Sequence, residues 1–205
     1  MSKTPPPTLR ARQAQLTRDQ ILGAARQLFA ERGYSRTSVR DIAEAAGVSS
    51  QTVYDSIGSK QAIVARLNDL IDAEADIVTI VGAGISSGDP DQVLAVQAKV
   101  ARSIMEQCGD IIRAVVSGAA AEPDLALVLA EGHRRHVEGA RRIVATLQEL
   151  GALHGSVTAD AAADTLSATS DVSFALLLVD AYGWSLDAVE TWITATNRSV
   201  LLGRT

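Results

Sequence analysis

The sequence predicts an all-α protein with a small N-terminal helical domain and a larger C-terminal helical body. Apolar residues recur at helical spacing along most of the 205 residues, and no strong alternating strand pattern is present. Ala, Val, Leu and Ile dominate a composition that is 47% hydrophobic but only 3% aromatic, which favours tightly packed helices. With 21% charged residues, the chain can bury a core and is not expected to be disordered.

Residues 1–16 contain three prolines and two arginines, and we expect them to form a flexible basic arm. Thr17 and Gln20 have capping-box spacing, so the first helix is expected to begin at Thr17. Its apolar residues then fall on one helical face until Gly33, which is typical of a helix C-terminus.

Residues 37–60 indicate two short helices joined by a tight turn at Gly47. Ser38, with Asp41 three residues later, is expected to cap the first of them, and Ser49 the second. A tight turn between two short helices is typical of the helix-turn-helix, which places its second helix in the DNA major groove. We therefore predict a DNA-binding domain at 17–60. A helical hairpin that merely packs is the alternative.

Small and hydrogen-bonding side chains occupy the outward positions of the second short helix. Gln51 can both donate and accept, which suits an adenine edge or a phosphate, and Arg40 on the preceding helix can reach a guanine edge or the backbone. The residues predicted to contact DNA are Thr37, Ser38, Arg40, Ser49, Ser50, Gln51, Thr52, Tyr54 and Lys60.

The charge distribution supports this assignment, although the net charge of -5 does not. Residues 1–60 hold nine Lys or Arg against five Asp or Glu, whereas residues 61–205 hold ten against nineteen. A basic N-terminal quarter on an acidic body is typical of a DNA-binding end on a solubilising core.

Between residues 17 and 64 the chain contains the motifs ILGAARQLFAERGY, TSVRDIAEAAGVS, TVY and SK. They resemble the DNA-binding domain of the TetR family of transcriptional regulators. The resemblance implies an all-helical homodimer, with a three-helix DNA-binding domain and a ligand-binding body. It also implies that Arg40, Ser50, Gln51 and Thr52 face the groove and that Thr37, Tyr54 and Lys60 contact phosphates. The chain departs from the family at Ser56-Ile57, where members often have His-Phe, and this puts a phosphate contact at Ser56 in doubt.

The C-terminal body, residues 61–205, resembles the family only loosely, through a Gly-Trp-Ser connection before the last helix. In the family, the last two helices commonly pair with those of a second subunit. The resemblance thus implies a dimer interface, and its candidate residues are Phe174, Leu177, Leu178, Val189, Trp192, Ile193, Thr196 and Val200. An ordinary core helix is the alternative.

The effector cannot be read from the sequence. Candidate pocket residues are Met105, Cys108, Arg113, His133 and Phe174, although a core or surface position is the favoured interpretation of each. The low aromatic content predicts a pocket lined by aliphatic groups, which favours a small apolar or amphipathic effector.

Other functions lack the residues that they need. The run from Ile77 to Gly88 contains Gly-Ala-Gly, but the third glycine of a dinucleotide fingerprint comes one residue late, so we expect a frayed helix end and a loop at 82–90. His133 and His136 lie among arginines that would repel a metal ion. We therefore expect no metal, no cofactor and no enzymatic activity.

The chain is expected to be cytoplasmic and not membrane-associated. Cys108 is its only cysteine, residues 1–16 do not resemble a signal peptide, and the longest uncharged runs are too short to span a bilayer.

The leading hypothesis is a repressor that binds a palindromic operator as a dimer and is released by a small molecule. The alternatives are a constitutive or architectural DNA-binding protein without an effector, and a helical ligand carrier or enzyme.

Overall fold

The structure, a computed structural model, describes residues 8–203, and every secondary-structure element within them is a helix. Residues 1–7 of the expected arm lie outside the described residues. The helices, in chain order, are α1 (Leu9–Arg32), α2 (Val39–Ala45), α3 (Ser50–Ser56), α4 (Lys60–Glu74), α5 (Ile77–Ser86), α6 (Pro90–Gly118), α7 (Pro123–Glu149), α8 (Ala159–Thr169), α9 (Val172–Leu176), the π-helix η1 (Leu177–Ala181) and α10 (Leu186–Leu202).

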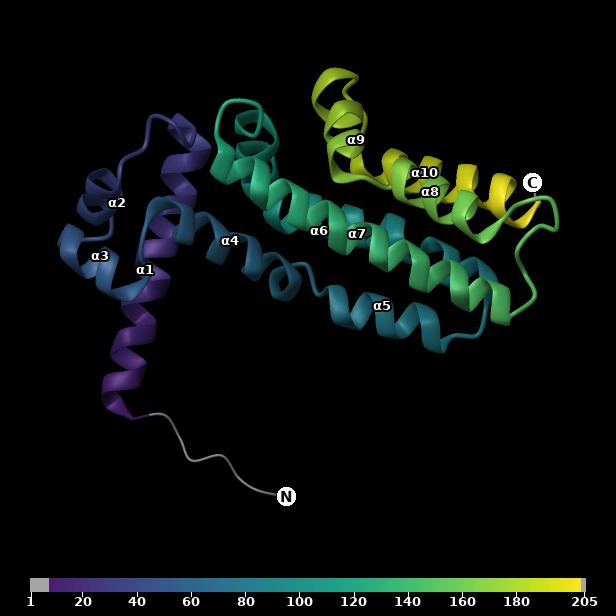
Figure 1. Cartoon of the computed structure of the whole chain (residues 1–205), viewed down its shortest axis with the longest axis horizontal. Helices are drawn as coiled ribbons and strands as arrows, with labels where there is room; N and C mark the ends of the chain where they lie inside the picture. The colour runs from purple at the N-terminus through teal and green to yellow at the C-terminus, as the bar shows by residue number, and fades with distance from the viewer. Residues whose placement is uncertain (1–7, 204–205) are drawn as a thin grey trace.

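Helices α1, α2 and α3 form one end of an elongated molecule, and α4 leads from them into the body (Figure 1). The long helices α6 and α7 lie side by side along the body, α5 packs against α6, and α8 and α10 cover the other side (Figure 1). The predicted all-α architecture with a small N-terminal domain is confirmed.

Helix α1 begins at Leu9, so the prediction of a start at Thr17 is wrong, and residues 9–16 are not a flexible arm. Thr8 caps the helix by accepting a hydrogen bond from the backbone N–H of Ala11. The Thr17 hydroxyl instead donates to the carbonyl of Gln13 within the helix. The prediction failed because the Thr17 hydroxyl forms its hydrogen bond with the preceding turn of the same helix, as threonines inside helices commonly do, and does not cap a new helix.

The N-terminal domain and the body share one hydrophobic core. Ile21 of α1 and Val53 of α3 are fully buried, and the same cluster contains Ile111 of α6 and Leu125 of α7. The domain is therefore packed on the body through α1 and is not connected to it by α4 alone.

The loop predicted at 82–90 is wrong, because residues 77–86 form the separate helix α5. Helix α4 ends at Glu74, and Asp76 adopts a left-handed conformation (φ 51°) that breaks the helix before α5 begins. Gly84 lets α5 lie against α6, since a Cβ atom there would be only 2.1 Å from Cγ2 of Val96. The glycine that suggested a nucleotide-binding turn therefore serves close helix packing.

Two other interruptions shape the body. Helix α6 is bent at Cys108 (φ -131°, ψ 15°). Residues 159–181 are long and apolar enough to cross a membrane by length and composition alone, and 39% of that apolar window is buried. They bend at Ser170, and Ala162 and Leu166 pack in one core cluster with α7, as expected for core helices of a globular body.

Candidate functional site

The helix-turn-helix has the caps that its sequence predicts. The backbone N–H of Asp41 donates to the Ser38 hydroxyl at 3.2 Å, and the Asp41 carboxylate accepts from the Ser38 backbone at 2.8 Å. The Ser38 hydroxyl also donates to the Asp41 carboxylate, and this hydrogen bond, together with the one from the Ser38 backbone, holds the pKa of Asp41 below its usual value. Ser49 caps α3 by accepting from Thr52, and Gly47 in the turn has φ 68°. Both short helices therefore begin and end where the sequence indicates.

The inner faces of α2 and α3 fix the angle of α3 on the domain. Ile42 and Val53 are fully buried and pack in the core with α1. Ile57 is partly buried against the same core, so it retains the packing role that a larger ring has in relatives. The departure at Ser56-Ile57 therefore leaves the support of α3 intact.

The outer face of α3 is polar and accessible. Gln51 and Tyr54 are exposed, Ser50 and Thr52 are partly exposed, and Arg40 of α2 is exposed nearby. The Gln51 amide donates to Asp55 one turn later at 2.8 Å, a contact that the sequence reasoning missed. Gln and Asp side chains four residues apart on a helix commonly form a hydrogen bond, so this contact could have been predicted from the spacing. A base contact by Gln51 has to replace or share this hydrogen bond.

The predicted phosphate contact of the Thr37 side chain is wrong. Thr37 is buried, and its hydroxyl donates to the Gly33 carbonyl at 2.9 Å. The Lys60 ammonium donates to the carbonyls of Tyr34 and Thr37 at 3.0 and 3.1 Å and lies 3.9 Å from the Tyr34 ring centroid. Its main structural role is thus to hold the loop between α1 and α2, and its contact with DNA stays a prediction.

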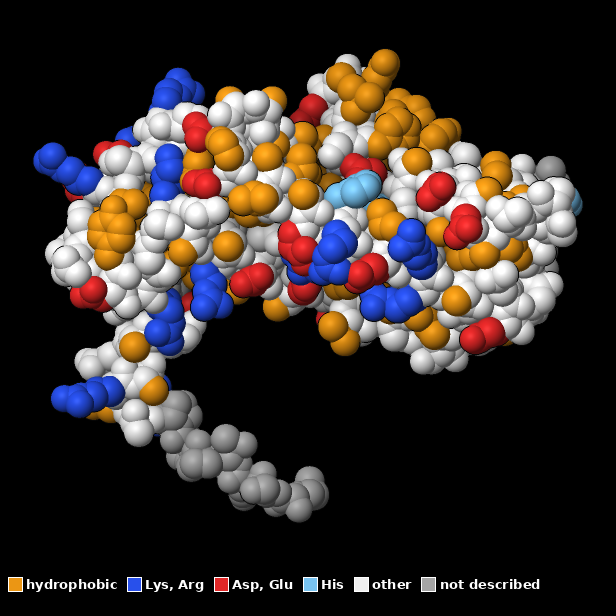
Figure 2. Space-filling view, viewed as in Figure 1, with side chains coloured by type: hydrophobic (Ala, Val, Ile, Leu, Met, Phe, Trp, Pro, Cys, Tyr) orange, Lys and Arg blue, Asp and Glu red, His pale blue; other side chains and the backbone are white. Residues whose placement is uncertain are grey.

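Arginine and lysine side chains gather around the N-terminal domain (Figure 2). Arg36, which the sequence reasoning did not select, is exposed in the loop before α2, and its Nε donates to the Arg32 carbonyl at 2.7 Å. The remaining guanidinium nitrogens of Arg36 are suitable donors for a phosphate.

An ion-pair network joins this domain to the body. Arg26 of α1 donates to both carboxylate oxygens of Asp110 on α6, at 2.6 and 2.8 Å, and to Glu74 at the end of α4, at 2.7 Å. It also donates to the carbonyl of Gln107, next to the bend in α6. One side chain therefore connects three helices at the domain boundary.

Cys108 lies at this junction and is fully buried. Its sulfur is 3.4 Å from a Glu74 oxygen, and burial together with that carboxylate raises the pKa of the thiol to about 12. The thiol therefore stays protonated and is not a reactive group.

The body contains a cavity of about 970 Å³ between α4, α5, α6, α7 and the start of α9. Such a volume matches pockets that hold drug-sized molecules. Valine and isoleucine side chains form most of the apolar part of the wall, and no Phe, Tyr or Trp is among the described residues that line it, as the low aromatic content predicted. The apolar lining includes Ile71, Ile77, Val78, Val81, Ile85, Val96, Val100, Ile104, Ile112, Val115, Val116, Val128 and Leu129.

Of the five predicted pocket residues, only His133 lines this cavity, and the other four are wrong. Met105 and Cys108 are buried in the core, and Arg113 pairs with Asp180 at 2.8 Å on another face. The Phe174 ring packs against Trp192, with a centroid distance of 5.6 Å. Helical periodicity could not show which face of α6 or α9 meets the cavity. The polar residues that line the cavity but are not among those five include Gln97, His136 and Arg142.

His133 and His136 are held apart by different partners. Nδ1 of His133 lies 3.5 Å from Asp171, whereas Nε2 of His136 donates to the Ser167 carbonyl at 2.9 Å. Among residues 8–203, no three His, Cys, Asp or Glu side chains are grouped to hold a metal ion.

The predicted dimer surface is only partly available. Leu178, Val189 and Ile193 are buried in the core of their own subunit, so their assignment to an interface is wrong. A helix with apolar residues on two faces does not reveal by sequence which face is internal. Phe174 and Thr196 are partly buried. The exposed members, Leu177, Trp192 and Val200, lie with the exposed Tyr182 on η1, α10 and the turn between them. Hydrophobic side chains are visible on this part of the surface (Figure 2).

A capped helix-turn-helix on a helical body with a cavity defines a helix-turn-helix regulator. Residues 21–67 match the family model described as bacterial regulatory proteins, tetR family. The chain is 40% identical over 80 residues to the transcriptional repressor KstR2 of Rhodococcus jostii, a match that covers 37% of this chain but only 39% of that protein. The N-terminal domain of this chain is therefore similar to that of TetR-family regulators, and the chain spans about two fifths of the length of this relative.

Solved structures show the same fold over nearly the whole chain. NalD of Pseudomonas aeruginosa, the secondary repressor of the MexAB-OprM multidrug efflux pump, has a TM-score of 0.75 at 22% identity, covering 92% of this chain and 98% of that one. A complex of SmeT with triclosan has a TM-score of 0.74 at 20% identity, covering 91% of each chain. At such identities the likeness establishes the fold of the body and nothing about its ligand.

Proposed function

We propose that this protein represses transcription in the cytoplasm by binding a palindromic DNA operator as a homodimer, and that a small molecule in the cavity releases it. The observation that carries the proposal is the continuity between the two sites. Helix α4 begins beside the helix-turn-helix at Lys60 and contributes Asn68 and Ile71 to the cavity wall.

DNA recognition would use the polar outer face of α3. Gln51 and Tyr54 are exposed on it, while Arg36 and Arg40 flank it on the loop and on α2. Polar groups at the centre would read bases, and the arginines at the edge would bind phosphates. Two such helices about 34–36 Å apart would enter successive major grooves of a palindrome.

The apolar surface formed by Leu177, Tyr182, Trp192 and Val200 supports dimerisation. Soluble monomers rarely expose grouped large hydrophobic side chains, and such a group is expected to be covered by a partner. A second copy covering it would form an isologous interface of the kind that two-fold DNA-binding proteins use.

Release by a ligand would act through the helices that line the cavity. A molecule between α4, α6 and α7 favours the arrangement of these helices that fits it. Arg26 ties α1 to both α4 and α6, so a shift of either helix reorients the N-terminal domain. Coupling of this type typically changes affinity by about 5- to 150-fold.

A constitutive DNA-binding protein is the second candidate function. The 970 Å³ cavity argues against it, because a body that served dimerisation alone would gain stability by filling such a space. KstR2 and NalD are named as repressors, and the SmeT complex shows that a protein of this fold holds a small molecule.

The decisive test is fluorescence anisotropy of the purified chain on DNA upstream of its own gene, across a salt series. Operator binding predicts a steep loss of affinity with salt and a loss of about 1–3 kcal/mol for Gln51→Ala on the preferred sequence but not on random DNA. An unchanged preference of the Gln51→Ala variant for the operator over random DNA would exclude Gln51 as a base-reading residue. A monomer by light scattering at the concentrations used would exclude the dimeric mechanism.

A further inference from the structure

The apolar part of the cavity wall is aliphatic. Among the 32 described residues that line the cavity, none is Phe, Tyr or Trp, and 15 are Val, Ile or Leu. Planar aromatic ligands gain much of their affinity from stacking on Phe, Tyr or Trp rings, and this wall offers none of these three. A ligand with a flexible aliphatic part is therefore the better match.

Two glycines on α7 enlarge this space. Gly132 and Gly139 lie within the helix and line the cavity, although glycine in a helix costs about 1 kcal/mol relative to alanine. A Cβ atom at Gly132 would meet nothing within 4 Å, and one at Gly139 would lie 3.3 Å from the Gln97 amide nitrogen. The absent side chains keep open a groove along the face of α7 that is turned toward α5 and α6.

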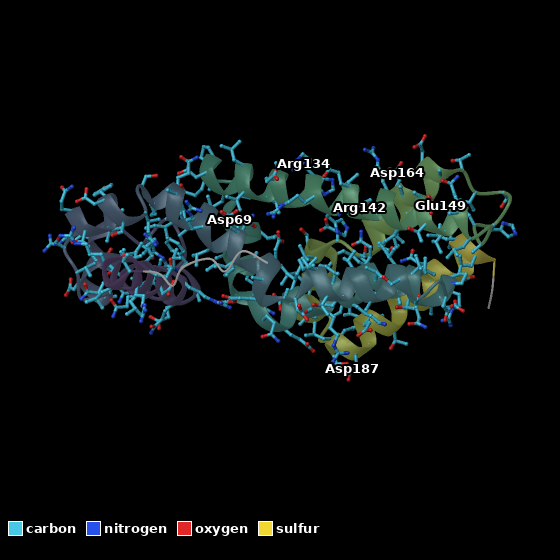
Figure 3. The ribbon with its side chains drawn as sticks, turned by 90° about the horizontal axis from the view of Figure 1, so that it is seen from below. Asp69, Arg134, Arg142, Glu149, Asp164 and Asp187 are labelled. Carbon is cyan, nitrogen blue, oxygen red and sulfur yellow. The ribbon has the colours of Figure 1, made fainter. Side chains whose placement is uncertain are left out.

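The groove has one uncommitted positive charge. Three arginines line the cavity, and two of them are paired: Arg134 with Glu131 and Glu138 at 2.7 and 2.6 Å, and Arg135 with Asp72 at 3.0 Å. Within residues 8–203, the structure gives the guanidinium of Arg142 no ion pair or hydrogen bond. Arg142 lies on α7 at the edge of the space between α7 and α5 (Figure 3).

The acidic residues that line the cavity are already engaged. Asp72 and Glu138 bind the two paired arginines, and Asp171 caps α9 by accepting from the Ser173 backbone at 2.7 Å. A cationic ligand would have to displace one of these partners, whereas an anion finds Arg142 free. The electrostatics of the cavity therefore favour an anion.

We propose that the effector is an aliphatic carboxylate whose head group binds Arg142 and whose chain lies along the groove at Gly139 and Gly132. The inference rests on the proposed ligand-responsive function and names the ligand class of that site. From Arg142 to Val128 the cavity-lining face of α7 extends about 21 Å at 1.5 Å per residue, which accommodates an extended acyl chain. The exposed position of Arg142 leaves the head group at the mouth and the chain inside.

The test is isothermal titration calorimetry of the full-length protein with laurate and with 1-dodecanol, which has the same chain without the charge. Laurate is expected to bind, with at least about ten-fold lower affinity for Arg142→Gln, since a charge-assisted hydrogen bond is worth about that factor. Arg141→Gln, at a neighbouring exposed arginine that does not line the cavity, is the matched control and should bind as the wild type does. Dodecanol should bind more weakly than laurate to the wild type and equally to both arginine variants.

Cavity occupancy is tested separately with Gly132→Leu, which fills the groove while improving helix propensity. It should abolish laurate binding, whereas Gly82→Leu on the exposed face of α5 should not. Unchanged laurate affinity in Arg142→Gln or in Gly132→Leu, or no laurate binding to the wild type, would overturn the inference. Operator affinity without ligand is measured on the same samples. Its absence would refute the proposed function, and its presence without laurate binding would refute only this ligand class.

Discussion

Replacing Arg26 by methionine tests the connection between the DNA-binding domain and the body. The change keeps most of the aliphatic stem but removes four hydrogen bonds: two to Asp110, one to Glu74 and one to the Gln107 carbonyl. It also leaves two carboxylates close together without their shared cation. We expect the variant to fold, because Ile21 and Leu28 still pack α1 into the core.

The expected loss of stability follows from partial burial. A charge-assisted hydrogen bond is worth about 1.5–3 kcal/mol when shielded and much less at the surface. Arg26, Glu74 and Asp110 have side chains that are 27%, 37% and 35% exposed, so each contact needs a substantial discount for solvent screening. We expect a loss of about 2–3 kcal/mol in the free energy of unfolding at neutral pH.

The loss should also depend on pH. Burial alone would raise the pKa of Asp110, but the hydrogen bond and charge of Arg26 lower it overall. A lowered pKa in the folded state contributes stability that is present above the ordinary carboxyl pKa and disappears as the pH falls through the lowered one. The difference between wild type and Arg26→Met should therefore shrink below about pH 4.

Urea unfolding followed by circular dichroism from pH 7 to pH 3 measures both effects. Arg26→Lys is the control, because it keeps the charge but cannot make the two-pronged contact with Asp110, and it should fall between the other two proteins. Identical midpoints for wild type and Arg26→Met at pH 7, or a difference that does not vary with pH, would refute the reasoning.

Three further predictions concern the DNA-binding head and the apolar surface. Asp55→Asn removes a negative charge beside the DNA and weakens the hold on Gln51, so it should raise DNA affinity several-fold in anisotropy at low salt; lower affinity would contradict this. Gly47→Ala puts a side chain at φ 68° and should lower the free energy of unfolding, measured with urea, by about 1 kcal/mol. The control Gly23→Ala, within helix α1, should raise the free energy of unfolding slightly. Trp192→Glu should shift the protein toward monomers in light scattering and reduce operator affinity, and an unchanged dimer would show that the interface lies elsewhere.

Local chemistry is what made much of the fold predictable. The caps at Ser38 and Ser49 were expected from the sequence, because a serine hydroxyl before a helical run satisfies free backbone N–H groups. The start of α1 was misplaced because Thr8 and Thr17 carry the same hydroxyl, and only the folded chain shows which one caps. Local signals therefore identified the helices better than their ends.

Tertiary relationships were the part that could not be predicted. The hydroxyl of Thr37 looked available for DNA until the packing of Gly33 and Leu28 around it was known. Arg26 gave no signal, because its partners Glu74 and Asp110 are 48 and 84 residues away in the chain. Sites built from contacts between distant segments leave no local pattern to detect.

The left-handed residue Asp76 has a mechanical consequence. Because it breaks the backbone between α4 and α5, a rotation of α4 is not carried rigidly into α5. Gly84 meanwhile anchors α5 closely against α6. In the proposed ligand-responsive function, helix α4 would pivot at its C-terminal end while α5 stays packed against α6. A ligand in contact with Ile71 would then reorient the DNA-binding domain while the rest of the cavity wall keeps its arrangement around the ligand.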